Sequence, residues 1–251
     1  FQVVDAGQPT HLQENAARQT IGLKRRFHSM PFRQATRIIC AARSIDRIRA
    51  AREFLDAIGP ESEALVVANN PAAADDLVRA IASQRGAVFG IHRVTLNRLI
   101  FMLASERMAA EGVSPLTKFG AIGIAARATF SLRARGDASY FDSVMNHPGF
   151  AEAIAATRED LILNRLGPRQ RDGLDAAGTS LAAILRQFDH EAAAANLLDR
   201  AGMIDHAIAA LGEDTMPPFA GIPTLLLDVP IESLCERDFI GALAARAPRL
   251  R

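Results

Sequence analysis

The sequence predicts a layered α/β fold in which a parallel sheet is interrupted by a helical insertion. Short apolar runs alternate with amphipathic segments over residues 36–113, an order typical of parallel strands joined by helices. Residues 114–216 contain helical patterns and no convincing strand pattern, and a strand-then-helix pattern returns over 217–251. We therefore expect a poorly ordered lead-in over 1–35, a first α/β part, a helical insertion, and a second α/β part that is truncated.

The first α/β unit is predicted over residues 36–55. Residues 36–42 form an apolar run expected to be a buried strand, 43–46 a turn, and 47–55 an amphipathic helix. A strand, a tight turn and a helix start form the place where an α/β nucleotide-binding domain holds phosphate. A phosphate loop needs glycines, which let backbone N–H groups approach the phosphates, and a Lys-Ser/Thr pair at the helix start.

The residues at this position lack that chemistry. The turn contains no glycine and no lysine, and an acid stands at the helix start, where a phosphate would lie. We interpret the stretch as a degenerate nucleotide-binding position and expect no bound cofactor. Its residues are Ala42, Arg43, Ser44, Asp46 and Arg47.

Three further strand-and-helix units are predicted in the α/β parts. Residues 63–68 and 88–94 are the next strands, followed by helices over 72–84 and 95–110. Pro71 suits the first position of its helix, and Thr95 is expected to cap the other. The last unit is an apolar strand over 224–230, which contains Asp228, and a helix over 232–246.

The insertion is predicted to be helical throughout. Glycine and proline residues divide it into segments over 116–135, 138–145, 149–164, 178–197 and 199–211. Its aromatic residues recur at helical spacing and are predicted to form its core. These are Phe130, Tyr140, Phe141 and Phe150.

Bulk charge excludes a general polyanion binder, since 29 Lys and Arg residues oppose 28 Asp and Glu residues. Arginine is nevertheless concentrated between Arg18 and Arg52. This concentration forms either a solvated basic face or a surface that contacts phosphate backbones.

Cys40 and Cys235 lie in or near apolar segments, which predicts buried thiols in a reducing cytoplasm. No apolar run approaches a membrane span. The chain starts with Phe1, and we expect it to be a piece of a longer protein.

Four stretches in one order carry a resemblance to a known family. They are Ala64 to Leu77 (ALVVANNPAAADDL), Phe89 to Leu99 (FGIHRVTLNRL), His147-Pro-Gly-Phe150, and Leu225 to Pro230 (LLLDVP). This plan resembles the N-terminal part of AddB-type proteins, in which degenerate UvrD-like helicase domains are fused to a C-terminal PD-(D/E)XK nuclease. The resemblance implies a RecA-like, P-loop NTPase-like fold and a catalytically inactive scaffold that guides DNA.

The resemblance also assigns expected roles to residues. The DNA-binding candidates are Asn69, Arg93, Thr95 and Arg98, although ordinary surface charge and helix capping explain the same residues. In an active helicase the last strand ends in Asp-Glu, which holds Mg²⁺ and polarises water. Here Asp228 is followed by Val229, so we expect a relic metal position, no bound metal and no catalytic residue. Expected partners are DNA, most simply single-stranded, and a helicase–nuclease subunit.

Two other functions fit the same sequence. One is an α/β enzyme domain that binds a nucleotide or small molecule at the ends of its strands. The other is a protein interaction domain that does not bind nucleic acid. The grouping of Arg43, Arg47, Arg93 and Arg98 on one face would favour the DNA-guiding function over the interaction domain.

Overall fold

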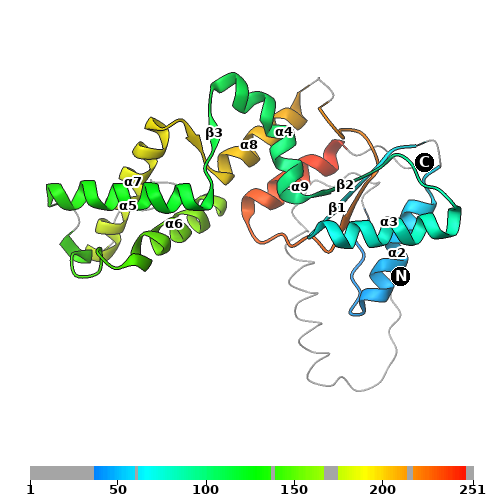
Figure 1. Ribbon diagram of the computed structural model, residues 1–251, viewed down its shortest axis with the longest axis horizontal. Coiled ribbons are helices and arrows are strands. Elements are labelled where there is room, and N and C mark those ends of the chain that lie inside the picture. The colour runs from blue at the N-terminus through cyan, green and yellow to red at the C-terminus, as the bar shows by residue number, and fades with distance from the viewer. Residues whose placement is uncertain (1–36, 60–61, 137–138, 167–174, 214–216, 247–251) are drawn as a thin grey trace, which may run out of the picture.

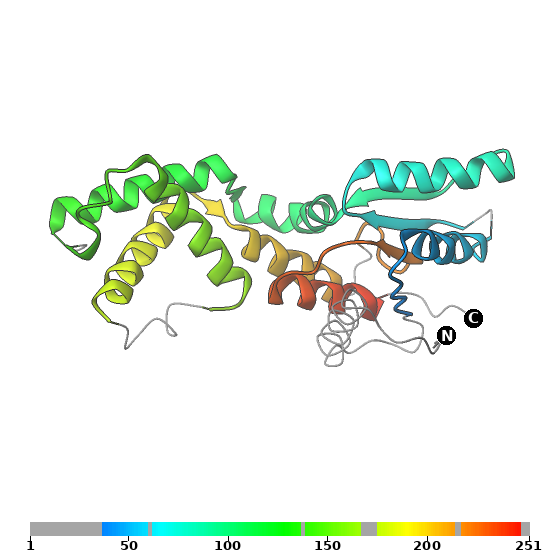
Figure 2. The ribbon, with the colours of Figure 1, turned by 90° about the horizontal axis from the view of Figure 1, so that it is seen from below.

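The protein is elongated, with a small sheet at one end and a helical lobe at the other. The computed structural model describes residues 37–59, 62–136, 139–166, 175–213 and 217–246. Figures 1 and 2 show the sheet with α2 and α3 at one end, α4, α8 and α9 in the middle, and α5, α6 and α7 at the far end. The predicted lead-in over 1–35, and Thr36, lie outside the described residues. None of the described helices has both the length and the apolar character needed to cross a membrane.

The sheet contains three parallel strands and confirms the predicted α/β class. Its strands are β1 (Ala64–Ala68), β2 (Ile91–Thr95) and β5 (Thr224–Leu227), in the order β2-β1-β5. In the register of the sheet, Val66 of β1 lies opposite Arg93 on one side and Leu225 on the other. β1 is therefore the central strand, and all five of its residues are buried.

Helices cover both faces of the sheet, which is why β1 is apolar at every position. On one face, Ala64, Val66 and Ala68 pack against α2 (Ser44–Asp56) and α3 (Pro71–Arg85). On the other face, Leu65 and Val67 share a core with three helices. These are α4 (Leu96–Glu111), α8 (Arg200–Gly212) and α9 (Leu234–Arg246).

The helical lobe has its own hydrophobic core. It contains α5 (Lys118–Arg135), α6 (Pro148–Leu163) and α7 (Ala176–Ala194), whose buried residues include Leu132, Ile154 and Phe188. The predicted segment over 199–211 forms α8, which packs into the core beside the sheet and not into that of the lobe. Phe141 and Phe150 pack against the core of the lobe as predicted.

Three predictions for the insertion are wrong. Phe130 is 74% exposed and Tyr140 58% exposed, so neither belongs to the core. The expected helix over 138–145 is a single 3-10 turn, η1 (Ser139–Phe141), followed by turns. A short pair of parallel strands, β3 (Ser114–Pro115) and β4 (Leu197–Leu198), lies where no strand was expected and joins the lobe to the central helices.

The predicted first strand does not form over residues 37–42, the part of it that the structure describes. Residues 37–41 are irregular, with Ile38 50% exposed and Ile39 41% exposed, and the Cys40 thiol is exposed instead of buried. An apolar run forms a strand only where a partner strand and a covering layer are present, and neither accompanies this run among the described residues. α2 begins at Ser44, so the predicted turn over 43–46 is helical from its second residue.

Cys235 is buried as predicted. It lies on α9, its Sγ donates to the backbone carbonyl of Ile162 at 3.6 Å, and burial raises the pKa of its thiol. Burial disfavours the charged thiolate form of Cys235. Cys235 therefore acts as a packing residue of the central core.

A buried arginine joins the lobe to α8. The guanidinium of Arg158 on α6 donates at 2.7 Å to Asp189 on α7 and at 2.7 Å to Asp199, and its carbon lies 4.5 Å from the centroid of the Phe188 ring. Asp199 also caps α8 by accepting from the N–H of Gly202 at 2.9 Å. Arg158 is only 7% exposed, so its charge is stabilised by these two carboxylates and not by water.

We expect Arg158→Ala to lower the free energy of unfolding by about 3–5 kcal/mol, because it leaves two partly buried carboxylates without their cation. Urea denaturation followed by circular dichroism measures the change. The matched control is Arg79→Ala, which removes an exposed arginine paired with Asp76 within α3 and should cost less than about 1 kcal/mol. Equal effects of the two substitutions would contradict the role given to Arg158.

Candidate functional site

The carboxyl ends of the three strands meet at one edge of the sheet, the edge where α/β domains place their ligand sites. β1 is followed by Asn69, β2 ends at Thr95, and β5 is followed by Asp228. Arg47 near the start of α2 reaches the same edge through its contact with Asp228. The fold therefore brings predicted site residues from four segments to one edge.

Arg47 and Asp228 form a two-point ion pair at this edge. Arg47 Nε lies 2.8 Å from Asp228 Oδ1 and Nη2 lies 3.2 Å from Oδ2, while Nη1 donates to the carbonyl of Ala41 at 2.7 Å. Asp228 adopts a left-handed backbone conformation (φ 49°), which Asp tolerates better than most residues. Arg47, from the predicted nucleotide-binding position, is thus paired with Asp228, the residue expected at a relic metal position.

The first turn of α2 carries its own negative charge. Asp46 Oδ2 accepts from Arg43 Nε at 2.9 Å, and its Oδ1 lies 3.3 Å from Arg49 Nη1. A carboxylate here stabilises the positive end of the helix dipole and repels an incoming phosphate. Ala42 and Ser44 are exposed, with no role that the structure assigns.

The helices that follow β1 and β2 are capped by their own residues. Asn70 Oδ1 accepts from the N–H of Ala73 at 2.9 Å at the start of α3, a cap that the predicted turn did not identify. Thr95 Oγ1 accepts from the N–H of Arg98 at 3.3 Å at the start of α4, which confirms the predicted cap. Asn69 is exposed beside these caps.

The structure does not gather the four arginines into one patch. Arg93 on β2 pairs with Asp75 of α3 at 3.0 Å, whereas Arg98 belongs to α4 on the other face of the sheet, with its guanidinium 5.9 Å from the centroid of Phe101. Arg47 contacts Asp228 at the end of β5, and β5 lies on the opposite side of β1 from β2. With β1 between them, the two edge strands are about 10 Å apart.

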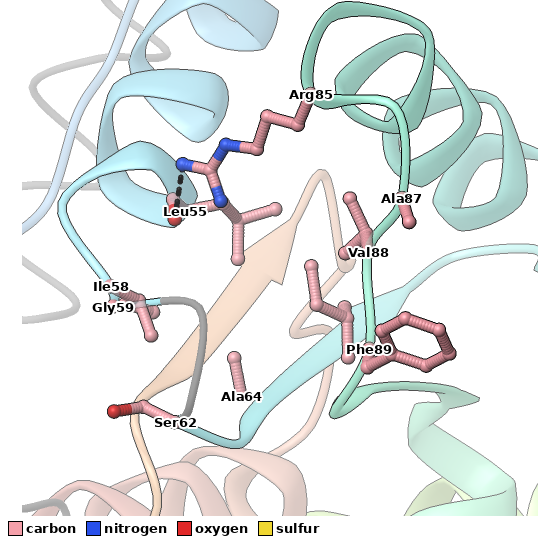
Figure 3. A pocket seen from close by; sticks show the side chains of 10 residues that line it. Leu55, Ile58, Gly59, Ser62, Ala64, Arg85, Ala87, Val88 and Phe89 are labelled. Atoms are coloured by element: carbon pink, nitrogen blue, oxygen red, sulfur yellow. Dashed lines mark hydrogen bonds between the residues drawn. The ribbon is translucent and has the colours of Figure 1, made fainter.

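A cavity of about 180 Å³ lies at the other end of the strands, near the amino ends of β1 and β2. Figure 3 shows its lining, with Phe89 at one side and the Arg85 guanidinium donating a hydrogen bond to the carbonyl of Leu55. Arg85 also pairs with Asp56 at 2.7 Å, so its charge is already balanced. The lining is mostly apolar, and the cavity is small beside the 300–1,000 Å³ typical of ligand sites. It therefore does not coincide with the predicted site.

In comparisons with known proteins, the chain matches no protein-family model and no curated protein sequence. A functional assignment therefore rests on the residues of this chain and their geometry.

The Arg47–Asp228 pair is expected to contribute a coupling free energy of about 0.5–1 kcal/mol, because it has good two-point geometry but is partly exposed. A double-mutant cycle with Arg47→Ala and Asp228→Ala, followed by urea denaturation at low salt, measures this coupling. It should shrink in 1 M salt, where the Debye length is about 3 Å. A coupling of zero at low salt would show that the two residues do not interact in solution.

Proposed function

We propose that this region is a catalytically inactive, helicase-like domain that serves as a scaffold and guides DNA in a DNA repair or recombination nuclease. The observation that carries the proposal is the Arg47–Asp228 ion pair. It lies where a working domain of this kind would hold the phosphates of a nucleotide and the associated metal ion. Each residue pairs with the other, so a ligand would have to compete with this ion pair for either charge.

Phosphoryl transfer needs a backbone cradle, a cation on the phosphates, a metal-binding acid and a residue that positions the nucleophile. At the proposed position the cradle lacks glycine, and the cation and the acid are paired with each other. Val229 follows the acid, where the resemblance to AddB-type proteins implies a glutamate in active relatives. These features together support an architectural role, within a parent protein that we propose to be a PD-(D/E)XK exonuclease.

The elongated shape supports the guiding half of the proposal, whereas the grouping of arginines that would also have favoured it is not formed, since Arg93 pairs with Asp75 and Arg98 lies on α4. The lobe of α5, α6 and α7 projects from the sheet through the central helices, which gives the protein a long surface along which a polymer could lie (Figure 2). The caps and ion pairs at the edge of the sheet keep this architecture fixed without a ligand. The proposal includes a helicase–nuclease partner subunit and a cytoplasmic setting.

A fluorescent ATP analogue titrated with Mg²⁺ should show no saturable binding at micromolar concentrations, because the groups that would hold the phosphates are engaged. Fluorescence anisotropy of the analogue provides the measurement. Micromolar binding that disappears in the Ser44→Ala variant would overturn the inactive half of the proposal. Persistent binding in Ser44→Ala with loss in Arg47→Ala would also overturn it, since Arg47 would then serve a ligand.

Single-stranded DNA should bind with an affinity that falls linearly on a log–log plot against salt, because contacts to phosphates release counterions. A fluorescein-labelled oligothymidylate titrated at several salt concentrations measures the slope. Absent binding, or an affinity independent of salt, would contradict the guiding half of the proposal. It would favour a protein interaction domain instead.

A further inference from the structure

Two short segments of chain connect the lobe to the rest of the molecule. Residues 112–117 lead from α4 into α5, and residues 195–199 lead from α7 into α8. The two segments pair as β3 and β4, where the N–H of Ser114 donates to the carbonyl of Asn196 at 2.9 Å. Each contains a residue in the left-handed backbone region, Gly112 (φ 67°) and Asn196 (φ 52°), which turns the chain at the crossing. We call these two segments the hinge.

Helix α6 links the lobe to the central helices at a second place. Its last turn lies beside α8 and α9 (Figures 1 and 2). Leu163 is buried in the core that those helices share with the sheet, and the carbonyl of Ile162 accepts from Cys235 Sγ at 3.6 Å. Within the described residues, Leu163 is the one fully buried side chain that α5, α6 and α7 contribute to that core. The apolar part of this contact is therefore small.

Ion pairs surround the small apolar contact. Arg165, directly after α6, donates from Nη1 to Asp205 Oδ2 of α8 at 2.9 Å, and its Nη2 lies 2.7 Å from Asp205 Oδ1 and 3.5 Å from Asp238 Oδ2 of α9. Asp238 also lies 3.6 Å from Arg237. We call Arg165, Asp205 and Asp238 the latch. Their side chains are 37–49% exposed, so dissolved salt reaches them.

The end of α6 is shaped to present this arginine. Arg165 has a left-handed backbone (φ 61°) because the N–H of Leu166 donates back to the carbonyl of Leu161 at 2.9 Å, which closes the helix. Glycine is the usual residue at such a position, and an arginine there costs backbone energy that glycine would not. The ion pairs that its guanidinium makes with α8 and α9 offset this cost.

The latch lies farther from the hinge than the buried arginine of α6 does. Arg158 donates at 2.7 Å to Asp199, which belongs to the hinge. Seven residues of helix separate Arg158 from Arg165, a rise of about 10 Å. A small rotation at the hinge therefore displaces the latch more than it displaces the Arg158 contact.

We propose that the lobe and the sheet-bearing part are two rigid bodies joined by the hinge, and that the latch holds them closed. Release of the latch lets the lobe rotate and exposes the Cys235 thiol to solvent, without unfolding either core. The two cores are separate clusters of buried residues. Parts of a protein that are held by few apolar contacts open at a lower free energy than the whole molecule. The inference is independent of the proposed function, because it applies whether or not the chain binds DNA.

The test measures the rate at which iodoacetamide alkylates Cys235 in the full chain carrying Cys40→Ser, which removes the other cysteine. At low salt, Arg165→Gln should raise the rate about two- to fivefold, the effect expected of a partly exposed ion pair on an opening equilibrium. Asp205→Asn/Asp238→Asn should raise it similarly. In 1 M salt, where the Debye length is about 3 Å, the rate of the parent should approach that of the variants.

The two latch variants separate opening from a direct electrostatic effect on the thiol. The charge of Arg165 lowers the pKa of Cys235, and the charges of Asp205 and Asp238 raise it. A direct effect would therefore slow alkylation in Arg165→Gln and accelerate it in the double variant, whereas opening accelerates both. The matched control is Arg85→Gln, which breaks a similarly exposed pair with Asp56 between α3 and α2 and should leave the rate unchanged.

Faster alkylation in both latch variants, with an unchanged control, supports the inference. Opposite changes in the two latch variants, or no change in either, overturn it. Urea denaturation followed by circular dichroism gives the free energy of global unfolding for each variant. An opening free energy from alkylation that equals this value in every variant also overturns the inference, because Cys235 would then be exposed only when the whole chain unfolds.

Discussion

The burial of β1 on both faces is the constraint on which the rest of the structure depends. Its five residues have no exposed surface, and its backbone pairs with β2 on one side and β5 on the other. Alternate side chains point to opposite faces, so one short strand organises two hydrophobic cores. Parallel pairing then brings the ends of the three strands to one edge, and this fixes where Thr95 and Asp228 lie.

Several polar groups at that edge are engaged by other groups of the chain. Asn70 and Thr95 cap the helices that follow their strands, and Arg47 and Asp228 pair with each other. Asn69 lies beside these caps and is exposed. These contacts are the basis of the architectural role that we propose for the domain.

Local sequence patterns predicted the elements that local forces determine. The apolar run of β1, Pro71 at the start of α3 and Thr95 at the start of α4 were all identified correctly. Features that depend on distant partners were not. Ile38 and Ile39 resemble residues of a buried strand, but strand formation needs a neighbour that the run itself cannot specify. The Arg47–Asp228 pair joins residues 181 positions apart, so it left no local signal, and the exposure of Phe130 followed from the side of α5 that meets α7.

Hydrogen exchange of backbone amides tests the central claim most directly, because it compares two similar apolar segments in one molecule. The account predicts that the amides of 65–68 are among the slowest to exchange, while those of 38–41 exchange close to the rate of an unfolded chain. The N–H of Leu65 donates at 2.9 Å to the carbonyl of Pro223, just before β5, and the N–H of Ala64 donates at 2.9 Å to the carbonyl of Gly90, just before β2. Protection of 38–41 comparable to that of β1 would contradict the account. Such protection would mean that residues 38–41 form a fourth strand beside β5, which is the strand that a phosphate loop requires.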